Sequence, residues 1–153
     1  MSADARVSKL GLELPPAPTP VGVYVPLVHV GDMTYVSGHG PLKPDGQMML
    51  GQVGSQVSQE EGYAAARQVG LAMLATLKEN LGSLDRVLRF VKVLGMVNAA
   101  PDFKNHPQVI NGFSELMVEV FGENGRAARS AVGMGSLPEN ISVEIEAIVQ
   151  VSE

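Results

Sequence analysis

The sequence predicts a single α+β domain whose two main helices pack on one face of a mixed β-sheet. Three observations predict it: two segments with helical periodicity, several apolar strand-like runs, and the order ββ(β)αβαββ along 153 residues. Two helices cannot cover both faces of so wide a sheet, so we expect both on one face. The other face of the sheet then has to be covered from water by another surface, and a second copy of the chain would supply it.

The chain begins with a segment that we expect to form an arm. Residues 1–20 end in a stretch where proline recurs from Pro15 to Pro20, and proline favours extended polyproline structure over regular ladders. We expect this arm to lie along the surface or to reach a neighbouring subunit. Residues 21–153 then form the single domain.

A β-hairpin is expected to open the domain. Residues 21–30 are rich in β-formers, Gly31-Asp32 supplies a tight turn, and residues 33–37 read as the returning strand. Glycine and proline then mark a loop. Residues 48–54 are expected to form a short edge strand.

The first long helix has clear start and stop signals. Ser58 and Glu61 form a capping box, and Gly82 stands where a helix commonly ends. Between them, apolar residues repeat at helical spacing, at Val69, Met73, Leu77 and Leu81. The dense apolar run at residues 86–97 is then predicted to be a central strand.

The last third of the chain is predicted to hold one helix and two strands. A second helix covers residues 108–121 and stops at Gly122. Two closing strands follow at residues 128–135 and 142–151, joined by a Leu137-Pro138 corner.

Composition excludes several classes of function. The net charge is −5 with no basic run, whereas a nucleic-acid binder needs a Lys/Arg face to neutralise phosphates. There is no cysteine, which excludes disulfides and thiolate metal sites. Residues 1–6 have no apolar run, so we expect no signal peptide, and no run is long enough to suggest a membrane span. We therefore expect a cytoplasmic protein without nucleic-acid or membrane partners.

Arg129 is the first candidate for chemistry because it lies in a strand among small and apolar residues. A guanidinium is a planar fork that binds a carboxylate through two parallel hydrogen bonds. In a cleft, Arg129 would hold the carboxylate of a small substrate. The alternative is a salt bridge to Glu144 or Glu146 on the paired strand.

Glu144 and Glu146 are two residues apart and therefore share one face of their strand. Repulsion between two like charges raises the pKa of one carboxyl. Such a carboxylate can position and deprotonate a water molecule. The alternatives are a solvated strand face or an ion pair between subunits.

The histidines give little support to a metal site. His29, His39 and His106 are scattered, and none has metal-ligand spacing to another. Of the three, His39 is the candidate for a functional role, because it follows Ser37-Gly38 in a glycine-rich turn.

The C-terminal pattern resembles the Rid family, also called YjgF-like or reactive intermediate deaminases. The run Ala128-Arg129-Ser130, the Leu-Pro corner and residues 143–148 (Val-Glu-Ile-Glu-Ala-Ile) are similar to the family's signature. The resemblance extends to Tyr24 before Ser37-Gly38, to Gly31 at the hairpin turn and to Asn111 in the second helix.

This resemblance implies a chorismate-mutase-like fold that assembles into a homotrimer with three clefts between subunits. It implies hydrolysis of reactive enamines and imines, such as 2-aminoacrylate and related 2-imino acids, to 2-keto acids and ammonia, without a cofactor or metal.

Roles for individual residues follow from the same resemblance. Arg129 would bind the substrate carboxylate and Glu144 would orient the attacking water. Tyr24, Ser37, Gly38 and Asn111 would line the cleft. Each has a structural alternative: Tyr24 burying its ring with a bonded hydroxyl, Ser37 fixing a turn, and Asn111 capping a helix.

The chain also departs from the family pattern, which points to a divergent subgroup. Ala131 stands where many members carry cysteine, and Pro26 and His39 differ as well. The spacing from Asn111 to Arg129 is one residue longer, which would displace Asn111. Two other functions stay open: a non-catalytic trimer that binds small carboxylates, and an endoribonuclease, which the acidic charge disfavours.

Overall fold

Five strands form one mixed sheet in the order β1-β2-β5-β3-β4 in a computed structural model that describes residues 1–153. The strands are β1 (Leu27–Val30), β2 (Met33–His39), β3 (Val87–Asn98), β4 (Ala128–Met134) and β5 (Val143–Val151). The pair β3–β4 is parallel and the other neighbours are antiparallel. The helices are α1 (Ala3–Lys9), α2 (Gln59–Leu81) and α3 (His106–Phe121).

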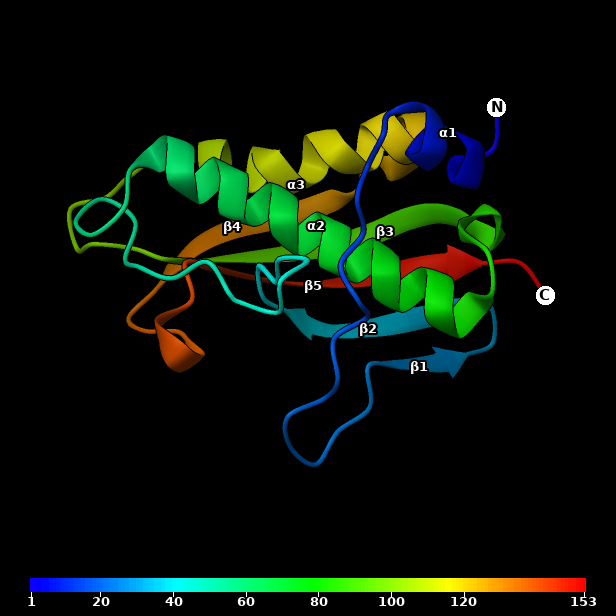
Figure 1. The fold of residues 1–153 in the computed structure, drawn as a ribbon, viewed down its shortest axis with the longest axis horizontal. Helices are drawn as coiled ribbons and strands as arrows, with labels where there is room; N and C mark the ends of the chain where they lie inside the picture. The colour runs from blue at the N-terminus through cyan, green and yellow to red at the C-terminus, as the bar shows by residue number, and fades with distance from the viewer.

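The two long helices, α2 and α3, lie side by side on one face of the sheet, as predicted (Figure 1). The sequence signals for α2 are confirmed, because Ser58 and Glu61 form the capping box and Gly82 ends the helix with φ 83°. α3 begins two residues earlier than predicted, at His106, with Pro107 in its first turn.

The core lies between these helices and the sheet. In β5, Val143, Ile145, Ala147, Val149 and Val151 are buried toward the helices. Their neighbours in the strand point to the other face, because side chains alternate along a strand. No helix covers that second face, so it is open in this chain (Figure 1).

Two glycines hold α3 close to its neighbours. A Cβ on Gly95 of β3 would come within 2.6 Å of Ile110 on α3, and a Cβ on Gly112 would collide with the Tyr63 carbonyl of α2. Only the absence of a side chain allows these approaches. They fix the distance from α3 to both the sheet and α2.

Three expectations about secondary structure are wrong. Residues 48–54 form only isolated bridges and no edge strand. The first strand begins at Leu27 and not near residue 21, because Pro26 has no N–H to donate, although its carbonyl accepts from the Ser37 N–H. The two closing strands are not neighbours, because β3 lies between β4 and β5.

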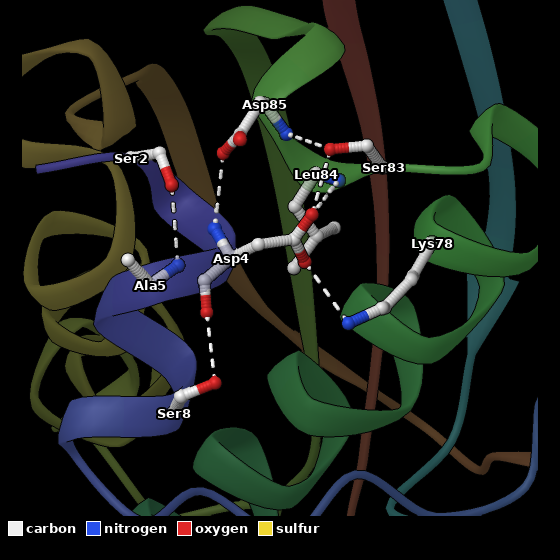
Figure 2. Close-up of polar contacts among 8 residues, drawn as sticks. All are labelled: Ser2, Asp4, Ala5, Ser8, Lys78, Ser83, Leu84 and Asp85. Carbon is white, nitrogen blue, oxygen red and sulfur yellow. Dashed lines mark hydrogen bonds and ion pairs between the residues drawn. The ribbon is translucent and has the colours of Figure 1, made fainter.

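The arm is not extended throughout, because residues 3–9 form α1, which packs against α3. Ser2 caps this helix, and Asp4 anchors it by accepting hydrogen bonds from the Ser83 hydroxyl at 2.6 Å and the Leu84 N–H at 3.3 Å (Figure 2). The Asp4 carboxylate also lies 3.0 Å from the Lys78 ammonium. The proline-based expectation failed because the prolines begin only after the helix ends.

None of the three helices is both long enough and apolar enough to cross a membrane.

We expect Asp4→Ala to lower the free energy of unfolding at neutral pH by about 1–2 kcal/mol, because the Ser83 hydroxyl, the Leu84 N–H and the Lys78 ammonium lose their partly buried partner. Burial alone would raise the pKa of Asp4, but Ser83 and Lys78 outweigh it and hold that pKa below its ordinary value. The stabilisation is therefore present above pH 3.8 and is lost as the pH falls through the lower folded pKa.

Urea unfolding at neutral pH and at about pH 2 measures this, with exposed Asp102→Ala as the matched control. Equal losses in the two variants at neutral pH, or a loss in Asp4→Ala that persists at the acidic pH, would contradict the anchor.

Candidate functional site

Arg129 lies on the helix side of the sheet, at its β4 edge. It stands opposite buried Val93 on β3, so both side chains point toward the helices. Its guanidinium donates to the Ser114 hydroxyl at 3.1 Å and to the Pro107 carbonyl at 3.3 Å, both on α3. α3 therefore holds the guanidinium by two neutral acceptors.

The charge of Arg129 has no carboxylate partner within ion-pair distance in this chain. The predicted alternative of a salt bridge to Glu144 or Glu146 is wrong, because β3 separates the two strands and the side chains point to opposite faces. Partial burial lowers the pKa of Arg129, since a low-dielectric surrounding disfavours the charge. An uncompensated guanidinium with free N–H groups is suited to binding a small anion.

An open hollow of about 610 Å³ lies in front of Arg129, between α3 and β4. Its lining is mostly polar and consists of Asn111, Ser114, Glu115, Val118, Glu119, Arg126, Ala127 and Arg129. The glutamates already have partners: Tyr63 donates to Glu115, and Arg67 binds Glu119 through two nitrogens. Arg126 pairs with Glu123. Arg129 is thus the cation of this hollow that is free to bind a ligand.

Asn111 and Arg129 both line this hollow. The displacement of Asn111 relative to the family pattern, which the longer spacing implies, stays a prediction. Asn111 lies inside α3 and is not its cap, since Asn105 takes that position. The sequence prediction missed Ser114, although it follows Asn111 by three residues and so shares its helix face.

Glu144 lies on the open face of the sheet, between buried Val143 and Ile145. Its carboxylate sits against Gly38 of β2: a Cβ added there would be 2.7 Å from the Glu144 Oε2 atom. Burial, and to a smaller extent the charge of Glu146, raises the pKa of Glu144. The predicted rise of one carboxyl pKa is therefore supported, with burial as the larger cause.

Ser37 lies on the open face of the sheet, whereas Tyr24 lies in the loop that precedes β1. Ser37 borders a hollow of about 410 Å³ on the open face, which Glu146 also lines. Its hydroxyl donates to the Val25 carbonyl at 2.6 Å and so holds the segment that leads into β1, which differs from the predicted alternative of fixing its own turn. Tyr24 is 50 % exposed, so the alternative of a buried ring is wrong, and its hydroxyl accepts from the Val21 N–H.

The predicted site residues therefore form two groups within one chain. Arg129 and Asn111 face the hollow beside α3, whereas Glu144, Gly38 and Ser37 lie on the other face of the sheet. The two groups suit different tasks in a hydrolysis: Arg129 can bind a carboxylate, and Glu144 can hold a water molecule. A single chain does not bring the halves together.

The structure contains no group of three or more His, Asp or Glu side chains that could hold a metal ion. His29 bonds to Thr34 on the hairpin, His106 begins α3, and His39 is buried beneath α2.

Comparison with known proteins gives a consistent match. Residues 4–147 match the family described as "YjgF/chorismate mutase-like, putative endoribonuclease". Protein TCP17 of Trypanosoma cruzi is 42% identical over 149 residues, covering 97% of this chain and 93% of the relative. The 2-iminobutanoate/2-iminopropanoate deaminase of Dermatophagoides farinae is 29% identical over 141 residues, covering 90% of this chain and 93% of the relative.

A solved structure, that of Atu1372 from Agrobacterium tumefaciens, a protein of unknown function, superimposes with a TM-score of 0.89. It is 40% identical, with 98% of this chain and 94% of that chain covered. The whole α+β arrangement, including α1, therefore has a counterpart among solved structures.

We expect Glu146→Gln to lower the pKa of Glu144, because the substitution removes the like charge beside it. The pKa should stay above that of an ordinary glutamate, since burial is the larger cause. A carboxyl ¹³C NMR titration of both proteins measures this, with exposed Glu60→Gln as the control. An unchanged or higher pKa would show that Glu146 does not act on Glu144.

Proposed function

The chain belongs to the YjgF/chorismate mutase-like (Rid) family, and from this premise we propose that it hydrolyses reactive 2-imino acids to 2-keto acids and ammonia. The observation that carries the proposal is Arg129, a partly buried guanidinium without a carboxylate partner that faces a hollow large enough for a small organic acid. The name of the mite relative, an iminobutanoate and iminopropanoate deaminase, supports the same substrate class.

Arg129 binds the carboxylate of the imino acid and so fixes the position of the carbon beside it. Ser114 and the Pro107 carbonyl keep the guanidinium plane in place. The remaining N–H groups of Arg129 can then donate two parallel hydrogen bonds to the substrate carboxylate. Placement of this kind converts a bimolecular encounter into attack within a bound complex.

Glu144 positions the attacking water and takes its proton. Oxygen bonds to the imine carbon, the nitrogen is protonated, and the carbon–nitrogen bond of the resulting carbinolamine breaks to release ammonia and the keto acid. The raised pKa of Glu144 makes its carboxylate a stronger base than an ordinary one. A protonated imine carbon is already electrophilic, so the reaction needs little beyond placement and a base.

Assembly into a homotrimer would bring the two halves of the site together. Arg129 and Glu144 are on opposite faces of one sheet, so the cleft needs the Arg129 half of one subunit and the Glu144 half of the next. The open face supports self-association, because its exposed side chains include Val28, Tyr35 and Val132. Tyr24 and Ser37 then line the cleft from the Glu144 side. The cytoplasmic location stays a prediction.

Two other functions are outcomes of the same test. A trimer that only binds 2-keto acids would use Arg129 and leave Glu144 without a chemical role. An endoribonuclease, a name that the family description carries, would need groups that act on a phosphodiester; the chain is acidic and its three histidines lie apart.

The direct test is ammonia release from freshly generated 2-aminoacrylate and 2-iminobutanoate. We expect acceleration by the wild-type protein and a loss of about 100-fold or more in kcat/KM for Arg129→Ala, because the carboxylate loses its charged fork. Arg126→Ala is the matched control, since that arginine borders the same hollow but pairs with Glu123.

Saturable binding of 2-keto acids without acceleration of any imino acid would favour the non-catalytic binder. RNA cleavage that Arg129→Ala abolishes, and that repurification leaves unchanged, would favour the nuclease. Equal activity in the Arg129 and Arg126 variants would remove Arg129 from the mechanism.

The pH dependence of kcat/KM gives a second test. Glu144 must be ionised to accept a proton, so we expect the rate to fall on the acid side through a pKa above that of an ordinary glutamate. Glu146→Gln should move this limb to lower pH. If the rate of Glu144→Gln still falls at the same acidic pH, the titrating group is not Glu144.

A further inference from the structure

His39, the last residue of β2, is a buried titratable group that the proposed reaction does not use. Its side chain is 4 % exposed and lies between the sheet and α2. The ring bonds on both sides: Nδ1 lies 2.6 Å from the Ser37 carbonyl and Nε2 lies 2.7 Å from the Thr76 hydroxyl of α2. The ring thus connects the helix layer to the backbone of β2.

These partners fix the tautomer of the ring. A carbonyl oxygen only accepts, so Nδ1 must carry the hydrogen and donate to Ser37. Nε2 of the neutral ring then accepts from the Thr76 hydroxyl. Burial lowers the pKa of His39, an effect that the Ser37 carbonyl partly opposes, and no charged side chain contributes to the shift. The Nδ1–H form is therefore the one that the surroundings favour.

The Ser37 carbonyl belongs to a bulge in β2. Val36 pairs with Ala147 of β5 and His39 pairs with Ile145, so Ser37 and Gly38 together stand opposite Glu146 alone. A bulge takes residues out of the regular ladder and re-aims them. Here it places Gly38 directly against the Glu144 carboxylate, where a Cβ would be 2.7 Å from Oε2.

We propose that His39 is a positioning residue that, braced by Thr76, holds the Ser37-Gly38 bulge against Glu144 and so sets where Glu144 holds the attacking water. This inference rests on the proposed function for its catalytic consequence. The arrangement itself stands on the two hydrogen bonds, the register shift and the contact between Gly38 and Glu144. An apolar side chain could fill the same space but could not bind the Ser37 carbonyl.

The proposal separates the two halves of the site kinetically. Arg129 governs binding of the carboxylate, whereas the bulge governs the chemical step on the other face of the sheet. We expect His39→Leu to lower kcat about tenfold and to leave KM within about twofold, since small displacements of a reacting group mainly affect the chemical step. His39→Gln, whose amide can both donate and accept, should recover most of the rate.

Thr76→Val preserves the shape of the helix surface and removes only the brace, so it keeps the proposal testable if His39→Leu does not fold. We expect a smaller loss of kcat, about threefold, with KM unchanged. His29→Leu is the matched control, because His29 has a similar hydrogen bond to Thr34 in the hairpin but does not contact the bulge. Losses of kcat in His39→Leu and Thr76→Val no larger than in His29→Leu would overturn the proposal.

Two readouts do not need activity and so separate this inference from the proposed function. Nitrogen-15 NMR of the wild-type imidazole should show His39 as the Nδ1–H tautomer at neutral pH; the Nε2–H tautomer would overturn the proposal. Hydrogen exchange at residues 36–40 should accelerate in His39→Leu and Thr76→Val but not in His29→Leu. Unchanged exchange in those two variants would also overturn it.

A wild-type protein that releases no ammonia would remove the proposed function alone, and these two readouts would still decide the role of His39.

Discussion

The alternation of side chains across one β-sheet is the constraint on which the rest of the structure depends. The same two-residue period that buries Val143, Ile145 and Ala147 beneath the helices turns Glu144 to the open face. Arg129, level with buried Val93, must point the other way. A core that needs its apolar residues inside therefore separates the cation from the carboxylate, and in the proposed reaction only a second copy of the chain can reunite them.

Each half of the site is held by a packed element, not by a loose loop. On one side, α3 lies close to the sheet because Gly95 leaves room for Ile110, and this places Ser114 where Arg129 can donate to it. On the other side, a glycine again permits the approach, between Gly38 and Glu144. Both charged groups are half-buried, which costs free energy of folding, and the proposed reaction would account for this cost.

Local signals in the sequence predicted local structure well. The capping box at Ser58, the stop at Gly82 and the period-two pattern of β5 all depend on neighbours a few residues away, and the structure confirms them. Pairing of strands is non-local, and nothing near Arg129 indicated that β3 would lie between it and Glu144. The Ser114 contact and the burial of His39 were missed for the same reason: their partners, Arg129 and Thr76, are distant in the sequence.

The most direct measurement is recovery of deaminase activity on mixing two inactive variants. Arg129→Ala and Glu144→Gln subunits are unfolded together, refolded into the mixed trimers that the proposal requires, and assayed for ammonia release from 2-aminoacrylate. If each cleft takes its arginine from one subunit and its glutamate from the next, random mixing restores about one quarter of the wild-type activity. Activity no higher than that of either variant alone, in trimers shown by mass spectrometry to be mixed, would contradict a site shared between chains.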